Sequence, residues 1–254
     1  MSYGRKMKIF TAMLLALLLV ACAQSHSKNG SGREYCPLIS YIFDDGYASH
    51  YDVVATMADE LDISVGFAIT TYVLGREGRV DAGQLLQLQS RGHEIINHSE
   101  THKDLRAPGV DQLVAGRDIE QGLAGLEALG LEIGTFVAPH SQTHGDYMSE
   151  VRRLHDLAYT SAREDVVWHA EDDLFSLPRL SSDGISLTDI QSAIDLAIKS
   201  NGFLTLYHHD VEAGSADEEK VRSVIEYALE SGAIFATPRD MARFASGEIN
   251  CPSI

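Results

Sequence analysis

The chain has 254 residues, 44% of them hydrophobic, which is enough to bury the core of one sizeable α/β domain or two small ones. Its formal net charge of −17 excludes nucleic acid as a favourable partner, because an acidic surface repels a phosphate backbone. The same charge argues against direct binding to anionic lipid headgroups.

The N-terminal segment has the layout of a bacterial lipoprotein signal. Three basic residues precede an apolar run at 9–20, which is too short to span a membrane. The run ends in "LVAC", which resembles a lipobox whose cysteine, Cys22, would be acylated and become the mature N-terminus. We therefore predict that residues 1–21 are a lipoprotein signal peptide. An ordinary cleaved signal followed by an unrelated cysteine is the alternative.

Cleavage would leave a mature chain that is more acidic and begins with a tether. The formal charge would fall from −17 to −20, because residues 1–21 carry three basic side chains and no acidic one. Residues 22–34 are polar and rich in serine and glycine, as in a flexible linker. We expect an exported monomer that is attached to the bacterial membrane only by its lipid. In a Gram-negative cell this would be the outer membrane or the periplasmic face.

Short apolar runs then alternate with amphipathic stretches. We predict strands at 38–43, 65–70, 93–97, 133–138, 157–162, 202–207 and 233–236, and a less regular strand at 175–180. We predict helices at 50–61, 81–91, 111–129, 147–156, 186–200 and 216–230, the last two starting with capping boxes at Ser186 and Ser215. This alternation predicts an α/β fold: a (β/α) barrel of seven or eight strands, either complete or incomplete and distorted. With no internal repeat, residues 35–254 are read as one domain.

Two cysteines remain in the mature chain. Cys36 lies just before the first predicted strand and Cys251 is close to the C-terminus. Outside the cytoplasm they can form a disulfide, which we favour over two buried free thiols.

Residues suited to metal binding follow the predicted strands, where barrels of this type carry their chemistry. The first strand is followed by Asp44 and Asp45, and the third by His98 and His102. Histidines four residues apart on a helical turn can bind one ion together. With one aspartate they would form a His/His/Asp set that leaves positions open for water and substrate, as in a catalytic metal site.

The motifs "FDDG" and "HSETH" resemble the first two motifs of the polysaccharide deacetylase family, the NodB-homology or carbohydrate esterase family 4 domain. Longer segments around them, and "LTLYHHDV" near the end, also look like family segments in the family order. The resemblance covers residues 38–238 and implies the family's barrel. It further implies that Asp45, His98 and His102 hold the metal and that Asp44 is the catalytic base.

The resemblance also implies the groups that complete the site. The backbone N–H that follows Pro139, which is that of His140, would hold the oxyanion. A histidine after the strand at 202–207 would protonate the leaving group. Counting from Leu204 gives His208, whereas aligning "HHDV" gives His209. We favour His209 and expect the other histidine to line the rim or pack beneath it.

Two positions depart from the family pattern. The third motif often carries an arginine that orients the base, and here Val137 stands in its place. Arg163, after the strand at 157–162, is our candidate replacement, with a surface ion pair as the alternative. Trp168 is a candidate aromatic wall for a sugar ring, with core packing as the alternative.

We predict a metal-dependent hydrolase that removes acetyl groups from N-acetylated sugars of an extracellular or cell-wall polysaccharide or oligosaccharide. The alternatives are an O-acetyl esterase on the same fold and a saccharide-binding lipoprotein without turnover. The expected cofactor is one divalent ion. Zinc suits the His/His/Asp set, and cobalt, nickel or iron would fit the same ligands.

Overall fold

The fold is built around one sheet that curves into a nearly closed barrel. The computed structural model describes residues 36–105, 107–141, 146–161 and 165–251. The predicted signal peptide and tether, with Cys22, lie outside the described residues. The strands are β1 (Leu38–Asp44), β2 (Gly66–Ile69), β3 (Glu94–Asn97), β4 (Thr135–Val137), β5 (Leu157–Ser161), β6 (Val167–Trp168), β7 (Leu177–Pro178), β8 (Leu180–Ser181), β9 (Phe203–His208) and β10 (Ile234–Phe235).

The main path of the sheet contains eight strands in the order β6-β9-β1-β2-β3-β4-β5-β7, while β8 pairs with β9 and β10 with β1. Among the described residues, every pairing is parallel except that of β6 with β9. The ends of the path, β6 and β7, approach each other, which nearly closes the barrel. The predicted barrel is thus confirmed. The strand predicted at 175–180 is divided at Arg179 into β7 and β8, and β6 was not predicted.

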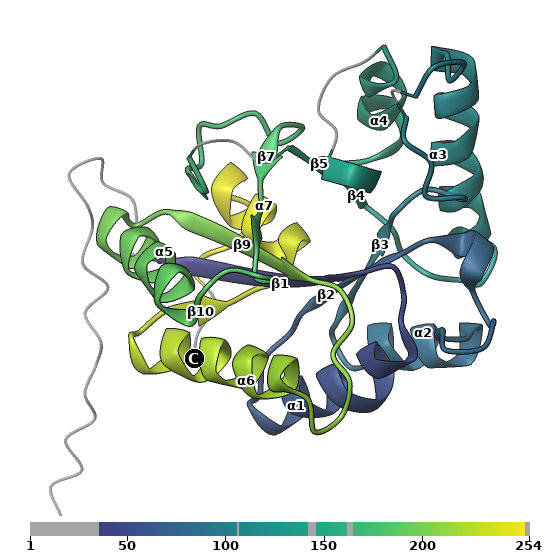
Figure 1. The fold of residues 1–254 in the computed structure, drawn as a ribbon. Helices are drawn as coiled ribbons and strands as arrows, with labels where there is room; N and C mark the ends of the chain where they lie inside the picture. The colour runs from purple at the N-terminus through teal and green to yellow at the C-terminus, as the bar shows by residue number, and fades with distance from the viewer. Residues whose placement is uncertain (1–35, 106, 142–145, 162–164, 252–254) are drawn as a thin grey trace, which may run out of the picture.

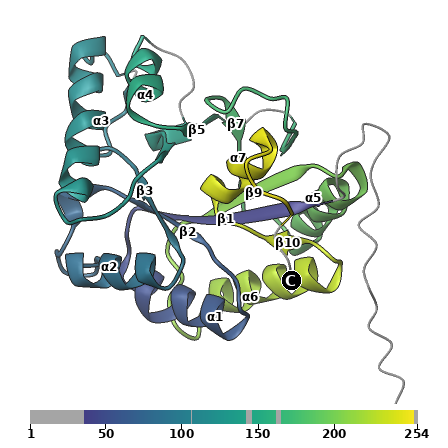
Figure 2. The ribbon, with the colours of Figure 1, turned by 180° about the vertical axis from the view of Figure 1, so that it is seen from behind.

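Helices surround the strands (Figure 1). They are α1 (Ala55–Glu60), α2 (Ala82–Ser90), α3 (Gln112–Glu127), α4 (Met148–Leu154), α5 (Leu187–Ser200), α6 (Ala216–Glu230) and α7 (Pro238–Ser246), with short helical turns η1 (His50–Val54), η2 (Thr71–Val73) and η3 (Pro139–Ser141). The predicted caps form: Ser186 Oγ accepts from Asp189 N and Ser215 Oγ accepts from Glu218 N, each at 3.1 Å. Helices α3 and α4 stand together at one corner, and α7, behind β9 in Figure 1, comes to the front in Figure 2.

The central strand β1 carries the core on both of its faces. All seven of its residues are buried, as expected for a parallel strand covered on both sides. Ile39, Tyr41 and Phe43 pack towards α1, α5 and α6. Leu38 and Ile42 point to the other face and join residues of β3, β4 and α7 in the barrel interior. Because side chains alternate along a strand, Asp44 continues this inner face and lies at the mouth of the barrel.

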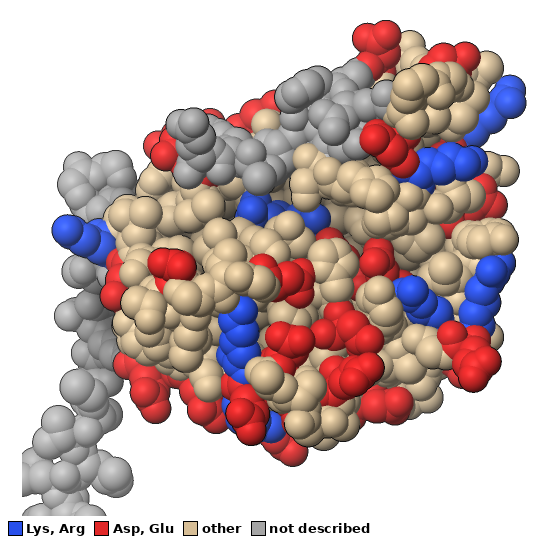
Figure 3. All heavy atoms as spheres, in the orientation of Figure 1, with Lys and Arg blue, Asp and Glu red and all other residues tan. Residues whose placement is uncertain are grey.

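Cys36 and Cys251 form a disulfide with a Cα–Cα distance of 5.8 Å, which confirms the favoured pairing. It links the entry to β1 with the segment after α7. Among the residues that the structure describes, no helix has the length and apolarity needed to cross a membrane. Acidic side chains outnumber basic ones on the face shown in Figure 3 and gather over α1 and α6, in keeping with the net charge of −17.

Candidate metal and catalytic site

Three side chains from two strand ends converge at the mouth of the barrel. Asp45 Oδ1, after β1, lies 3.5 Å from His98 Nε2 and 3.3 Å from His102 Nε2, both in the loop after β3. One ligand atom from each residue lies within 4.8 Å of the other two. These are the three residues that the sequence predicted to meet, and they could hold one metal ion.

The donor set fits a divalent cation. Asp45 Oδ1 is buried and has no hydrogen-bond partner among the described residues, which is costly unless a ligand completes the site. His98 Nδ1 donates to the carbonyl of Val137 at 2.7 Å, so its Nε2 keeps a lone pair directed towards Asp45. Val137, which stands where the resemblance leads one to expect an arginine, thus orients His98 through its backbone carbonyl.

The protonation states suit metal binding. Burial, with the proximity of the His98 ring, lowers the pKa of His102 to about 4, so its imidazole is neutral at pH 7. Burial alone would raise the pKa of Asp45, but the neighbouring imidazoles of His98 and His102 hold it well below its usual range. A carboxylate and a neutral imidazole are the forms that bind cations.

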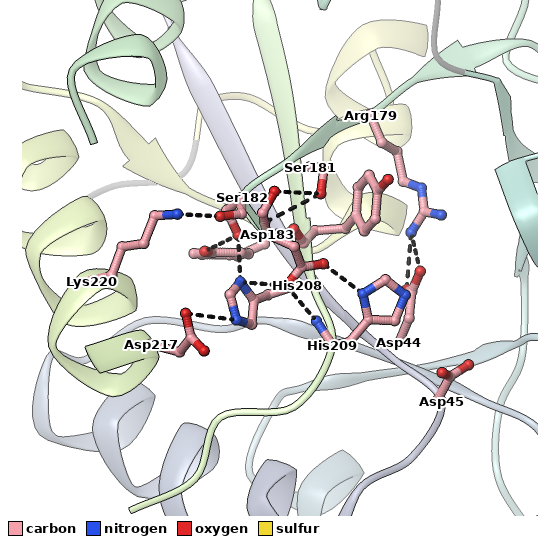
Figure 4. Close-up of polar contacts among 12 residues, drawn as sticks. Asp44, Asp45, Arg179, Ser181, Ser182, Asp183, His208, His209, Asp217 and Lys220 are labelled. Atoms are coloured by element: carbon pink, nitrogen blue, oxygen red, sulfur yellow. Dashed lines mark hydrogen bonds and ion pairs between the residues drawn. The ribbon is translucent and has the colours of Figure 1, made fainter. Parts of the chain in front are cut away.

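The two adjacent aspartates point in different directions (Figure 4). Asp45 has a φ of 77°, in the left-handed region that non-glycine residues seldom adopt. The chain therefore turns sharply after Asp44, and the second carboxylate leaves the direction of the strand. Asp44 stays buried and points to Arg179, while Asp45 points to the histidines.

Arg179 is the ion-pair partner of Asp44. Its Nη1 donates to both carboxylate oxygens, at 2.9 and 2.8 Å, and its Cζ lies 4.2 Å from the centre of the Tyr207 ring. The two side chains are only 5% and 3% exposed. Arg179 thus fixes the orientation of Asp44, the role for which the sequence analysis put forward Arg163, which lies outside the described residues.

The sequence itself carries a signal for Arg179. It is the charged residue inside the predicted apolar strand "FSLPRL". A guanidinium buried in such a strand needs a buried carboxylate as partner.

Asp183 contacts the two adjacent histidines at the end of β9, His208 and His209. Its Oδ2 lies 2.5 Å from His209 Nδ1 and its Oδ1 lies 3.0 Å from His208 Nδ1 (Figure 4). The bond to Asp183 raises the pKa of His209 against the effect of burial, and the charges of Asp44 and Asp45 add to the rise. Asp183 is a site residue that the sequence analysis missed.

The two histidines occupy different environments. His209 has a side chain that is 43% exposed, whereas that of His208 is 2% exposed. His208 Nε2 points towards Asp217 of α6, at 3.8 Å, and burial lowers the pKa of His208. His209 is therefore the accessible histidine of the pair, whereas His208 is buried.

The sequence profile described as "Polysaccharide deacetylase" matches residues 32–160, half of the 254-residue chain. The chain belongs to the polysaccharide deacetylase family. This match includes both motifs that carry Asp45 and the histidine pair. The resemblance identified from the sequence is thereby confirmed, and with it a hydrolase family that acts on acetylated sugars.

Solved structures of this family have a similar fold at low sequence identity. A family 4 acetyl xylan esterase from Clostridium thermocellum, solved with a cobalt ion, is 17% identical, with a TM-score of 0.57 over 85% of this chain and 93% of that one. The Xyl-CE4 domain of a xylanase from the hindgut metagenome of Trinervitermes trinervoides is 16% identical, with a TM-score of 0.57 over 84% and 92%.

A third similar structure is the catalytic domain of a peptidoglycan N-acetylglucosamine deacetylase from Eubacterium rectale. It is 16% identical, with a TM-score of 0.54 over 79% of this chain and 88% of that one. No curated protein matches the sequence.

The remaining candidate residues of this deacetylase-family chain differ in their placement. Pro139 is buried, and His140 is exposed with a φ of 59°. His140 Nε2 donates to the carbonyl of His102 at 3.3 Å, so its ring lies beside the metal-ligand loop. Trp168 does not line the site: it is fully buried in β6, with its ring centre 4.5 Å from that of Phe203. Its interpretation as a sugar wall was wrong, because β6 folds inward against β9.

Proposed function

We propose that this protein is a metal-dependent hydrolase that removes acetyl groups from N-acetylated sugars of an extracellular or cell-wall polysaccharide. The observation that carries the proposal is the Asp45–His98–His102 cluster, whose buried aspartate oxygen has no hydrogen-bond partner among the described residues. It lies beside two oriented pairs, Asp44 with Arg179 and His209 with Asp183.

In this proposal Asp45, His98 and His102 hold one divalent ion, for which zinc is the first choice and cobalt, nickel and iron also suit the ligands. A divalent ion at such a site supplies an activated water nucleophile and polarises the acyl carbonyl.

The protein's own groups then manage the protons. Asp44 would accept the proton of the attacking water. It is fixed by Arg179, and it lies next to the proposed ligand Asp45 but does not point at the histidines. His209 has Nδ1 bound to Asp183, so Nε2 is the atom that would donate a proton to the leaving amine. The backbone N–H of His140 would stabilise the oxyanion.

An O-acetyl esterase is the second candidate. The structures of similar fold include both an acetyl xylan esterase and a peptidoglycan N-acetylglucosamine deacetylase. An amine is a poorer leaving group than an alcohol and depends more on a strong, well-positioned acid. The Asp183–His209 pair supplies such an acid, and this favours N-acetyl groups over O-acetyl groups as the substrate.

The deciding experiment combines metal content with turnover. Purified protein is stripped of metal, reloaded separately with zinc, cobalt, nickel or iron, and assayed for acetate release from N-acetylated chitooligosaccharide and from acetylated xylan. We expect His98→Ala and His102→Ala to lose tight metal binding and turnover together, while His169→Ala, outside the cluster, keeps both. A stoichiometric ion retained by both cluster variants would contradict the ligand assignment. Faster release from xylan would favour the esterase.

We also propose that residues 1–21 are removed and that Cys22 carries a lipid, so that the tether at 22–34 connects the catalytic domain at 35–254 to the membrane. Mass spectrometry of the N-terminus from a bacterial host would detect the acyl mass. Cys22→Ser should remain unlipidated. A wild-type N-terminus without lipid would contradict this part of the proposal.

A further inference from the structure

A loop from beyond β2 closes over the turn that carries Asp45. Ala48 N donates to Gly78 O and Val80 N donates to Gly46 O, each at 3.0 Å. Between these two bonds, Tyr47 and Arg79 form an antiparallel bridge. The segment at 74–80 is therefore held against residues 45–48 by main-chain hydrogen bonds on both sides of Arg79.

The side chain of Arg79 reaches back to the metal-ligand residue itself. Its Nη1 donates to the backbone carbonyl of Asp45 at 2.8 Å. Its Cζ lies 3.9 Å from the centre of the Tyr47 ring, so the guanidinium is stacked as well as hydrogen-bonded. The planar group is thus fixed by two contacts, on residues 45 and 47.

Asp45 requires such support. Its φ of 77° lies in the left-handed region, which is unfavourable for a residue with a Cβ, so the turn would relax if its neighbours allowed it. Oδ1 lies 3.5 and 3.3 Å from the imidazoles of His98 and His102 but makes no hydrogen bond with a described residue, so the side chain restrains its own direction only weakly. The direction of the carboxylate therefore depends on how firmly the backbone of Asp45 is held.

We propose that Arg79 is a positioning residue for the metal site: by binding the carbonyl of Asp45 and stacking on Tyr47, it keeps the Asp45 carboxylate aimed at His98 and His102. This inference rests on the proposed function, because it takes the cluster to be a metal site. Arg79 acts on the ion only through Asp45.

Arg79 also has an effect that would weaken metal binding, opposite to its positioning effect. Its positive charge repels a cation, so removing it would tighten metal binding if Coulomb repulsion dominated. The guanidinium is directed at a carbonyl oxygen and an aromatic face, both of which offset its charge locally. Loss of an outer partner of a metal ligand typically weakens metal affinity by roughly 10–100-fold, so we expect positioning to dominate.

The chain offers a matched control on the same loop. Arg76 stacks on Tyr72 with its Cζ 3.8 Å from the ring centre, nearly the same geometry as Arg79 on Tyr47. In the described part of the chain, no hydrogen bond or ion pair joins Arg76 to Asp45. Arg76→Met therefore removes an equal charge and an equal stack without touching the ligand.

The test is a competition titration of metal-free protein with zinc and with cobalt, comparing wild type, Arg79→Met and Arg76→Met. We expect zinc affinity to fall roughly 10–100-fold in Arg79→Met and to stay unchanged in Arg76→Met. The visible spectrum of the cobalt form should change in Arg79→Met alone, because the Asp45 ligand is displaced. If Arg79→Met does not fold by circular dichroism, Arg79→Lys decides, since it keeps the charge but loses the planar group and should still bind zinc more weakly.

The possible results separate the two proposals. Wild-type protein that binds no ion overturns the proposed function and this inference with it. Tight binding by wild type, with unchanged or tighter binding by the folded Arg79 variant, overturns this inference alone. Equal losses in Arg79→Met and Arg76→Met would also overturn it, because the effect would then belong to the loop or to the charge.

Discussion

Neighbouring residues of the same type have different environments in this site. Asp44 is buried against Arg179, and Asp45 is turned by its positive φ towards two imidazoles. Asp183 likewise binds two adjacent histidines that differ widely in exposure. The chemistry of each residue therefore follows from its contacts and not from its residue type.

Exchanging each aspartate for asparagine should separate their roles. Asp44→Asn should keep the metal and lose ~10²–10⁴-fold in turnover, the usual span for a general base. Asp45→Asn should weaken the metal itself, because a neutral amide replaces a charged ligand. Zinc titration of both metal-free variants, with kcat for the loaded forms, measures the two effects on one scale. Loss of the metal in Asp44→Asn with retention in Asp45→Asn would reverse the assignment.

Asp183→Asn should shift the alkaline limb of the pH dependence of kcat/KM to lower pH. The bond to Asp183 raises the pKa of His209, so the protonated acid persists to higher pH in the wild type than it would alone. In the variant, a neutral amide replaces the charged carboxylate, so His209 loses its proton at a lower pH. The pH–rate profiles of both forms provide the measurement, with zinc affinity as the control. An unmoved limb would show that Asp183 does not tune the acid.

At the scale of elements, the loop after β3 is tied to α3 and α4 through a buried polar network. Asn97 Nδ2 donates to Ile119 O of α3 and to His155 Nε2, each at 3.0 Å. Asn97 Oδ1 accepts from Ser99 N at 3.0 Å, and Ser99 Oγ accepts from His102 N at 3.1 Å. The position of His102 thus depends on the packing of two helices against the barrel.

This network should make stability depend on pH. Burial lowers the pKa of His155 to about 4, below the value of ~6.5 of an unfolded histidine. Between these values the unfolded chain binds a proton that the folded chain does not, so the free energy of unfolding falls as pH falls from about 6.5 to 4, by up to ~1.4 kcal/mol per pH unit for one such group. Buried His50, with its pKa lowered to about 4, acts in the same direction.

Urea titrations across this pH range provide the measurement. His155→Gln, which retains a polar group for Asn97, should show a shallower loss of stability on acidification than wild type. Equal slopes for the two proteins would contradict the role of His155.

At the scale of the whole molecule, the Cys36–Cys251 disulfide connects two segments that are 215 residues apart. It lies before β1, whereas the site follows β1. Because β1 has seven residues, at ~3.3 Å per residue, the disulfide and the candidate site are about 20 Å apart. The disulfide should therefore raise the free energy of unfolding without changing metal binding or turnover.

Cys36→Ser/Cys251→Ser should lower the free energy of unfolding by ~2–5 kcal/mol, the usual cost of removing a native disulfide. Zinc affinity and turnover should not change at temperatures where both proteins are folded. Denaturant unfolding and metal titration give the two readouts. A loss of metal affinity in the folded variant would show that the two ends of the barrel are coupled.

The sequence by itself determined what depends on near neighbours in the chain. The alternation of apolar runs and amphipathic stretches predicted a barrel and most of its strands, and serine caps marked the starts of α5 and α6. The spacing of His98 and His102 predicted a histidine pair near an aspartate, and the family resemblance implied that this aspartate is Asp45, since each motif is a short stretch of sequence. Helix α7 was missed although its signals, a Thr237 cap followed by Pro238, were present.

Only the tertiary structure decided which distant residues meet. Arg179 pairs with an aspartate 135 residues away, and this depends on the pairing of β7 with β5, of β8 with β9 and of β9 with β1. Asp183 reaches both histidines because β8 lies beside β9, and Trp168 is in the core because β6 pairs with β9. Such contacts are set by strand register and by the burial of charge across the whole barrel, which no local pattern of residues encodes.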